Sequence, residues 1–71
     1  MTIGEAFRPG RVIEFNGDYY ICSYRKKIDT NDKNYIFSKY LTNIETFEII
    51  SPHDKWEIAR QWENVTDFME G

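Results

Sequence analysis

The dipeptide Asn16-Gly17 stands between two segments that are rich in β-branched and aromatic residues, 12–15 and 19–24. Such a dipeptide between strand-forming segments is the strongest short-range signal of a two-residue β-hairpin, because both turn positions need a positive φ that Asn and Gly tolerate. The sequence therefore predicts a tight hairpin, and residues 8–11 (Arg-Pro-Gly-Arg) predict a turn that leads into it. Both arms carry adjacent apolar residues, so we expect both faces of the hairpin to be covered.

The middle of the chain changes from polar to strand-like. Residues 29–34 are polar and contain turn-favouring Asn and Asp, which predicts a loop. Apolar residues then recur near helical spacing, yet the residue types are mostly Tyr, Ile, Phe and Thr, which favour strands. We predict strands over 35–41 and 44–50 that join around Thr42-Asn43, with a short helix over 35–42 as the alternative.

Residues 51–54 (Ser-Pro-His-Asp) have the pattern of a helix N-terminus, with serine as the N-cap, proline at the first helical position and an acidic residue at the third. A helix that begins here would place Ile58, Trp62, Val65 and Met69 on one apolar stripe. We therefore predict a C-terminal helix whose stripe packs on the sheet. The segment after Asn64 either continues this helix or turns again.

The length of 71 residues predicts one domain, 1–71. With a single cysteine and a single histidine, the chain has no intrachain disulfide and no zinc-ligand set, so its stability must come from apolar burial. The predicted fold class is α+β: a small, strongly twisted antiparallel sheet of four to five strands with one C-terminal helix packed on it. The strand-turn-strand opening over 9–21 resembles that of SH3-like barrels, and this resemblance implies a partly open barrel.

The residue types needed for catalysis are scarce. Only Cys22, His53 and Asp54 offer a nucleophile with a neighbouring base. A lone cysteine in a strand is typical of a small buried hydrophobe, and a histidine in the first turn of a helix is usually solvated. All four glycines are isolated, so there is no glycine-rich phosphate loop. We predict that the chain is not an enzyme, that it has no catalytic residues, and that it binds no metal or cofactor.

The N-terminus lacks the pattern of a signal peptide, and no segment approaches the ~20 apolar residues of a membrane span. We therefore expect a cytoplasmic protein without membrane contact. The richness in Asn, Asp, Lys, Tyr and Ile favours a small accessory protein of bacterial or phage origin.

The predicted helix suggests a site for an unidentified protein partner. Trp56 lies about 120° from Trp62 on the helical wheel and therefore off the apolar stripe, beside Arg60. Tryptophan and arginine are enriched among interface hot spots. The hypothesis is a protein-binding module that uses Trp56 and Arg60 together with Tyr19 and Tyr24 of the hairpin. The competing interpretation is that Trp56 only covers a sheet edge or the N-terminal segment.

Nucleic-acid binding is the alternative function. Residues 1–40 carry seven Lys/Arg against five Asp/Glu, whereas residues 41–71 carry two against seven. Cations that follow phosphates, with aromatic faces that stack on bases, suit a single strand. Arg25, Lys26, Lys27 and Tyr35 are the residues predicted for such a site. The net charge of −3 argues against it, because sequence-independent affinity depends on positive charge.

Overall fold

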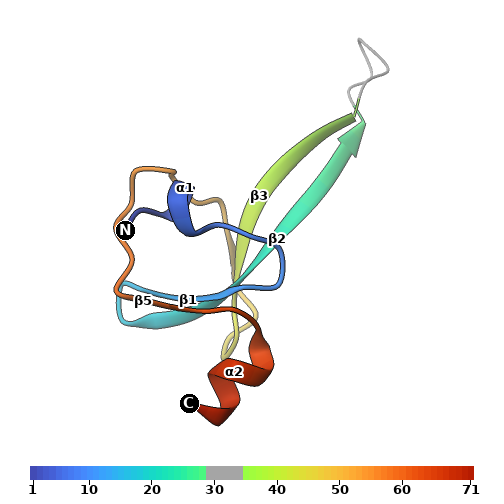
Figure 1. Cartoon of the computed structure of the whole chain (residues 1–71). Coiled ribbons are helices and arrows are strands. Elements are labelled where there is room, and N and C mark those ends of the chain that lie inside the picture. Colours follow the sequence, from blue (N-terminus) through green and yellow to red (C-terminus); the bar gives the residue numbers. More distant parts are fainter. Residues whose placement is uncertain (29–34) are drawn as a thin grey trace.

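The computed structural model describes residues 1–28 and 35–71, and the loop predicted at 29–34 lies outside them. One antiparallel sheet has the strand order β4-β3-β2-β1-β5 (Figure 1). The elements in chain order are α1 (Ile3–Ala6), β1 (Val12–Phe15), β2 (Asp18–Ile28), β3 (Tyr35–Asn43), β4 (Ile49–Ile50), β5 (Arg60–Trp62) and α2 (Val65–Glu70). The α+β class with a five-stranded sheet and a C-terminal helix is confirmed. The sheet is not closed into a barrel, so the SH3-like arrangement stays a prediction.

The predicted hairpin is confirmed. Strands β1 and β2 pair from Phe15 opposite Asp18 to Val12 opposite Ile21. Both turn residues have positive φ, 53° at Asn16 and 83° at Gly17. This is the conformation that a two-residue turn with the twist of its flanking strands requires.

We expect Gly17→Val to lower the free energy of unfolding by about 1–3 kcal/mol, because a β-branched residue is strained at this φ. A Cβ at this position would meet no atom within 4 Å, so the cost comes from the backbone alone. Urea unfolding measures it. Asn16→Gly is the control and should be tolerated, since glycine accepts the φ of 53° at that position. Equal midpoints for Gly17→Val and the wild type would contradict the turn assignment.

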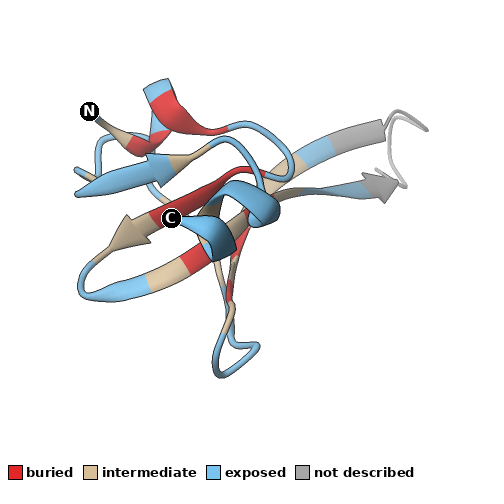
Figure 2. Ribbon diagram, turned by 60° about the horizontal axis from the view of Figure 1, so that its bottom comes forward, coloured by how far each residue is buried: buried red, intermediate tan, exposed pale blue. Residues whose placement is uncertain are grey.

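One face of the sheet carries the hydrophobic core. Alternation along the strands points Ile13, Tyr20 and Leu41 to this face, and α1 covers it with Ile3 (Figure 2). A capping box between Thr2 and Glu5 starts this short helix. The core cluster consists of Ile3, Phe7, Ile13, Tyr20, Cys22 and Leu41, with Phe15, Ile50 and Ile58 packed against it.

The opposite face is covered where α2 lies beside β5. Phe68 of α2 packs on Trp62 and Tyr19, with ring centroids 4.9 and 5.0 Å apart, and Val12 is fully buried. Arg11 is also buried, and its Nη1 donates to the Ala6 carbonyl at 2.6 Å. As expected, strand β1 is covered on both faces.

The turn predicted at Thr42-Asn43 is wrong by a few residues. Strand β3 continues through Asn43, and the chain reverses over 44–47. The Asn43 side chain explains the shift, because its Oδ1 accepts the N–H groups of Glu45 and Thr46 at 2.8 and 3.1 Å. Asparagine therefore stabilises the turn that follows it, as Asx turns do. The alternative helix over 35–42 is not formed.

The helix predicted from Ser51 is wrong. Residues 51–59 form no helix, because their carbonyl groups bind the N-terminal segment: Asp54 accepts from Gly4 at 3.0 Å and Trp56 from Ile3 at 2.8 Å. Trp62 then belongs to β5, which pairs with β1. The C-terminal helix begins later, where Asn64 caps it by accepting the N–H of Asp67 at 2.8 Å.

Candidate functional site

Strands β2 and β3 extend beyond the rest of the sheet as a two-stranded hairpin (Figure 1). Strand β1 pairs with β2 only as far as Ile21, and β4 pairs with β3 only at Leu41 and Thr42. The β2–β3 pairing continues past both limits, through Lys39 opposite Tyr24 and Ser38 opposite Arg25. We call this part of the hairpin, residues 24–26 and 37–40, the ribbon.

The outer edge of β3 is open along the ribbon, and Pro52 explains why. The Asn43 N–H donates to Glu48 of the returning chain at 2.8 Å, so odd-numbered β3 residues direct their main-chain groups to this edge. The β3–β4 pairing stops at Ile50, and Pro52 follows two residues later. Proline has no N–H to donate, so the pairing ends. The outward groups of Phe37 and Lys39 have no strand partner among residues 1–28 and 35–71.

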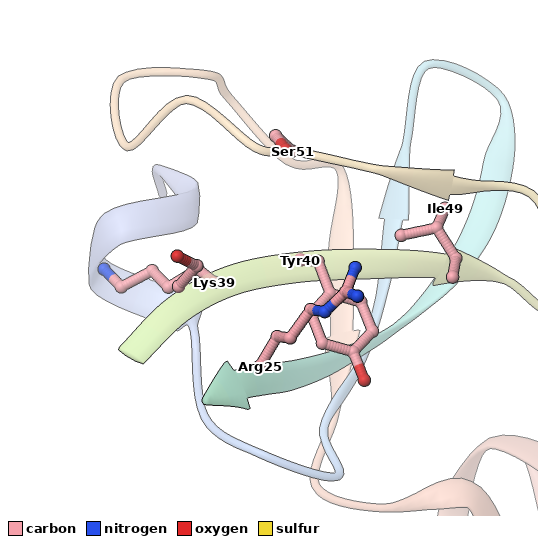
Figure 3. A pocket seen from close by; sticks show the side chains of 6 residues that line it. Arg25, Lys39, Tyr40, Ile49 and Ser51 are labelled. Atoms are coloured by element: carbon pink, nitrogen blue, oxygen red, sulfur yellow. The ribbon is translucent and has the colours of Figure 1, made fainter. Parts of the chain in front are cut away.

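A hollow of about 450 Å³ lies beside this edge on the face opposite the core. Arg25 extends from β2 across β3 toward Tyr40 and Ile49 (Figure 3), and Ser38, which pairs with Arg25, also lines the hollow. No hydrogen bond or ion pair engages the Arg25 guanidinium within the described part of the chain. The hollow therefore holds an available cation. Its lining residues are Arg25, Ser38, Lys39, Tyr40, Ile49 and Ser51.

Lys39 contributes main chain to this hollow and sends its side chain to the other face of the sheet. Its Nζ lies 3.1 Å from Oδ1 of Asp54 and 5.4 Å from the ring centroid of Phe7. Figure 3 shows the side chain running toward α1, away from Tyr40. Its charge is thus already paired, unlike that of Arg25.

A second hollow, shallow and widely open to solvent, lies on the core face of the ribbon and is lined by Tyr24 and Phe37. Their rings meet edge to face with centroids 6.4 Å apart. Tyr24 is anchored by Phe7, whose ring centroid lies 5.1 Å away, whereas 63% of Phe37 is exposed. The ribbon therefore presents an exposed aromatic pair together with Lys26 on its core face, and Arg25 on the other.

The structure separates Trp56 from Arg60. Trp56 stacks on Phe15 with centroids 4.9 Å apart and an interplanar angle of 8°, and its carbonyl binds the N-terminal segment. Arg60 lies 4.9 Å from the ring centroid of Trp62. The helical geometry that placed Trp56 beside Arg60 is absent, and Trp56 covers the hairpin and the N-terminal segment.

The two predicted tyrosines also lie apart. Tyr19 is half-buried between Trp62 and Phe68, where it helps to attach α2 to the sheet. Tyr24 is exposed on the ribbon. Of the four residues predicted to bind a protein, only Tyr24 lies beside the open edge.

The residues predicted to bind nucleic acid all lie on the β2–β3 hairpin. Arg25 and Lys26 are exposed neighbours on the ribbon, and the backbones of Lys27 and Tyr35 continue it in β2 and β3. The side chains of Lys27 and Tyr35 lie outside the described residues. Sequence reasoning missed four residues beside the edge, and the signal that would have found them is Pro52 as the end of a strand. They are Phe37, Ser38, Tyr40 and Ile49.

The residues considered for catalysis do not form a set. Cys22 is fully buried in the core, and burial raises the pKa of its thiol, which keeps the thiol neutral at pH 7. His53 lies at the surface beside Trp56, with ring centroids 5.9 Å apart. Among the residues that the structure describes, no group of three or more His, Cys, Asp and Glu could hold a metal ion.

No protein-family model, no curated protein and no solved structure matches this chain. Within the described ranges, no helix is long and apolar enough to cross a membrane.

Proposed function

We propose that this chain is a non-enzymatic protein-binding module that contacts its partner through the ribbon. The observation that carries the proposal is the open β3 edge between two hollows. An exposed strand edge is a template for pairing with another chain, and exposed aromatic residues such as Phe37 favour burial in an interface. A partner that covers the ribbon would pair with the exposed strand edge and bury the exposed aromatic side chain.

The proposal also includes the arrangement of the strands and the role of the protein in the cell. An SH3-like arrangement of the strands and a role as a cytoplasmic accessory protein of bacterial or phage origin are motivated by sequence pattern and composition. Folds of this kind host many unrelated functions, so the open edge and side chains of the ribbon, and not the fold, support binding.

Nucleic-acid binding is the second candidate because positive charge is concentrated on the same hairpin. Its described residues, 25–28 and 35–40, carry four Lys/Arg and no Asp/Glu, in a chain of net charge −3. Binding to a single strand would make log affinity fall with log salt, with a slope of about −0.7 per neutralised phosphate. The edge-to-face geometry of Tyr24 and Phe37 favours this candidate less, since base stacking needs open ring faces.

Affinity capture from a nuclease-treated lysate tests the proposal. We expect Phe37→Ala to reduce the captured partner by about tenfold, the effect of losing roughly 1.4 kcal/mol of binding free energy. Phe47→Ala is the matched control, because Phe47 is 76% exposed but lies in the turn over 44–47. Circular dichroism verifies that both variants are folded.

Equal capture by Phe37→Ala and Phe47→Ala would contradict a site on the ribbon. Capture that disappears on nuclease treatment, together with steeply salt-dependent oligonucleotide binding that Arg25→Ala weakens, would replace the proposal with the nucleic-acid candidate.

A further inference from the structure

We infer that the ribbon binds an extended acidic peptide segment of another protein, which adds to the sheet as a new strand along the open edge of β3. This inference rests on the proposed function and specifies its mode. It is carried by the unpaired main-chain groups of the edge, by the unengaged Arg25 guanidinium on one face, and by the exposed Phe37 ring on the other.

The main chain supplies the first step. Phe37 and Lys39 direct their N–H and C=O groups outward, two residues apart, as an antiparallel neighbour requires, and we assign this orientation to the bound peptide. A peptide strand completes the ladder that β4 leaves at Pro52. Main-chain hydrogen bonds of this kind provide affinity in strand addition, and hollows for alternate side chains provide specificity.

The face opposite the core selects for charge. A peptide residue opposite Ser38 directs its side chain to this face, because paired residues share a face. There it meets the hollow beside Arg25, Tyr40 and Ile49. A guanidinium forms its strongest hydrogen bonds with a carboxylate, often in a bidentate manner. We therefore assign Asp or Glu to this peptide position.

The core face selects for apolar character. The next peptide residue lies opposite Phe37 and points to the face where Phe37 and Tyr24 line the second hollow. A branched aliphatic side chain would cover the exposed Phe37 ring. The preferred ligand thus alternates acidic and apolar residues, with the apolar residues opposite Phe37 and Lys39.

Charge also selects among the possible occupants of the edge. A second copy of the chain would place two hairpins side by side, each with four Lys/Arg and no Asp/Glu over 25–28 and 35–40, and like charges across strands are unfavourable. A nucleic acid has no row of amide and carbonyl groups with which to continue the ladder. An acidic peptide complements the positive charge of the hairpin and pairs with the main-chain groups of the β3 edge.

The test uses fluorescein-labelled octapeptides of alternating Glu and Val, compared with octapeptides of alternating Lys and Val. Fluorescence anisotropy at about 150 mM salt follows binding to the full chain, and at this salt concentration surface charges are screened beyond about 8 Å. We expect saturable binding of the Glu peptide and at least about tenfold weaker binding of the Lys peptide, with the preference reversed by Arg25→Glu. Absence of Glu-peptide binding, or equal affinities for the two peptides, would overturn the inference.

Peptide N-methylation tests the strand geometry directly. The peptide residues opposite Phe37 and Lys39 are the Val residues, and their N–H groups point at β3, while those of the Glu residues point to solvent. Methylation of the Val amides should abolish binding, whereas methylation of the Glu amides should change it little. Equal effects of the two patterns would exclude strand addition.

A matched pair of variants tests the same edge from the protein side. Phe37→Ala removes the ring, whereas Phe37→Pro removes both the ring and the outward N–H. This N–H makes no bond to β2, and proline is tolerated at such an edge position. We expect the proline variant to bind the Glu peptide about tenfold more weakly than the alanine variant, the cost of roughly one hydrogen bond. Equal affinities would contradict the main-chain contact.

Three further outcomes are decisive. Concentration-dependent dimerisation of the chain that Phe37→Pro abolishes would assign the edge to a second copy and overturn the inference. If Phe37→Ala abolishes capture of the partner but the octapeptides do not bind, strand addition is wrong and the proposed function stands. If the octapeptides do not bind and Phe37→Ala leaves capture of the partner unchanged, both strand addition and the proposed function are wrong.

Discussion

Leu41→Ala is expected to lower the free energy of unfolding by about 2–5 kcal/mol, the range for a leucine removed from a close-packed core. Leu41 is fully buried near the C-terminal end of β3, paired with Cys22 on one side and Ile50 on the other. Domains have only about 5–15 kcal/mol of stability in total, and a short chain without a disulfide belongs near the lower limit. This single change should therefore leave a large unfolded fraction.

Urea unfolding followed by tryptophan fluorescence measures the effect. Phe37→Ala is the matched control, since Phe37 lies on the same strand and faces the same side of the sheet but is 63% exposed. Its cost should stay within about 0.5 kcal/mol, as for most surface changes. Similar costs for the two variants would contradict the position assigned to the core.

Trp62→Ala is the second large effect, and we expect a loss of about 2–3 kcal/mol, below the range for a fully buried tryptophan because Trp62 is only half-buried. Its ring contacts Tyr19 and Phe68, and the Arg60 guanidinium lies over it. Without the ring, α2 loses its main attachment to the sheet. Urea unfolding gives the free energy, and far-ultraviolet circular dichroism reports the loss of the helix.

Trp56→Ala provides the comparison. Trp56 contributes a stacked contact with Phe15 at the surface, so its removal should cost about 1 kcal/mol, close to the value of one aromatic pair. A larger cost for Trp56→Ala than for Trp62→Ala would show that the closure of the N-terminal segment matters more than the attachment of α2.

The hairpin was predictable because all its determinants are local. Asn16 and Gly17 alone satisfy the positive φ values of the turn, and the neighbouring residues favour strands. The start of the second helix was not predictable from Ser51-Pro52, because a proline that suits the first turn of a helix equally ends an edge strand. Long-range hydrogen bonds to Gly4 and Ile3 decide between the two, and no window of sequence around Pro52 contains them.

The candidate site was visible in part. Tyr24, Arg25 and Lys26 are recognisable from sequence as an aromatic and basic segment. The open edge is not, because it depends on where the β3–β4 pairing stops, after Ile50, and register is a property of the assembled sheet. Trp56 was misplaced for a related reason: its apparent position off an apolar stripe assumed a helix that pairing with other segments prevents.

The position of β1 between β2 and β5 also determines the order in which the sheet can assemble. Strand β1 meets β2 across a two-residue turn, but its other neighbour, Arg60–Trp62, comes from near the opposite end of the chain. Contacts that close long loops carry a larger entropic cost and slow the folding reaction. The hairpin with Gly17 is thus placed to form early in folding, whereas β5 and the Ile3–Trp56 hydrogen bond complete the domain afterwards.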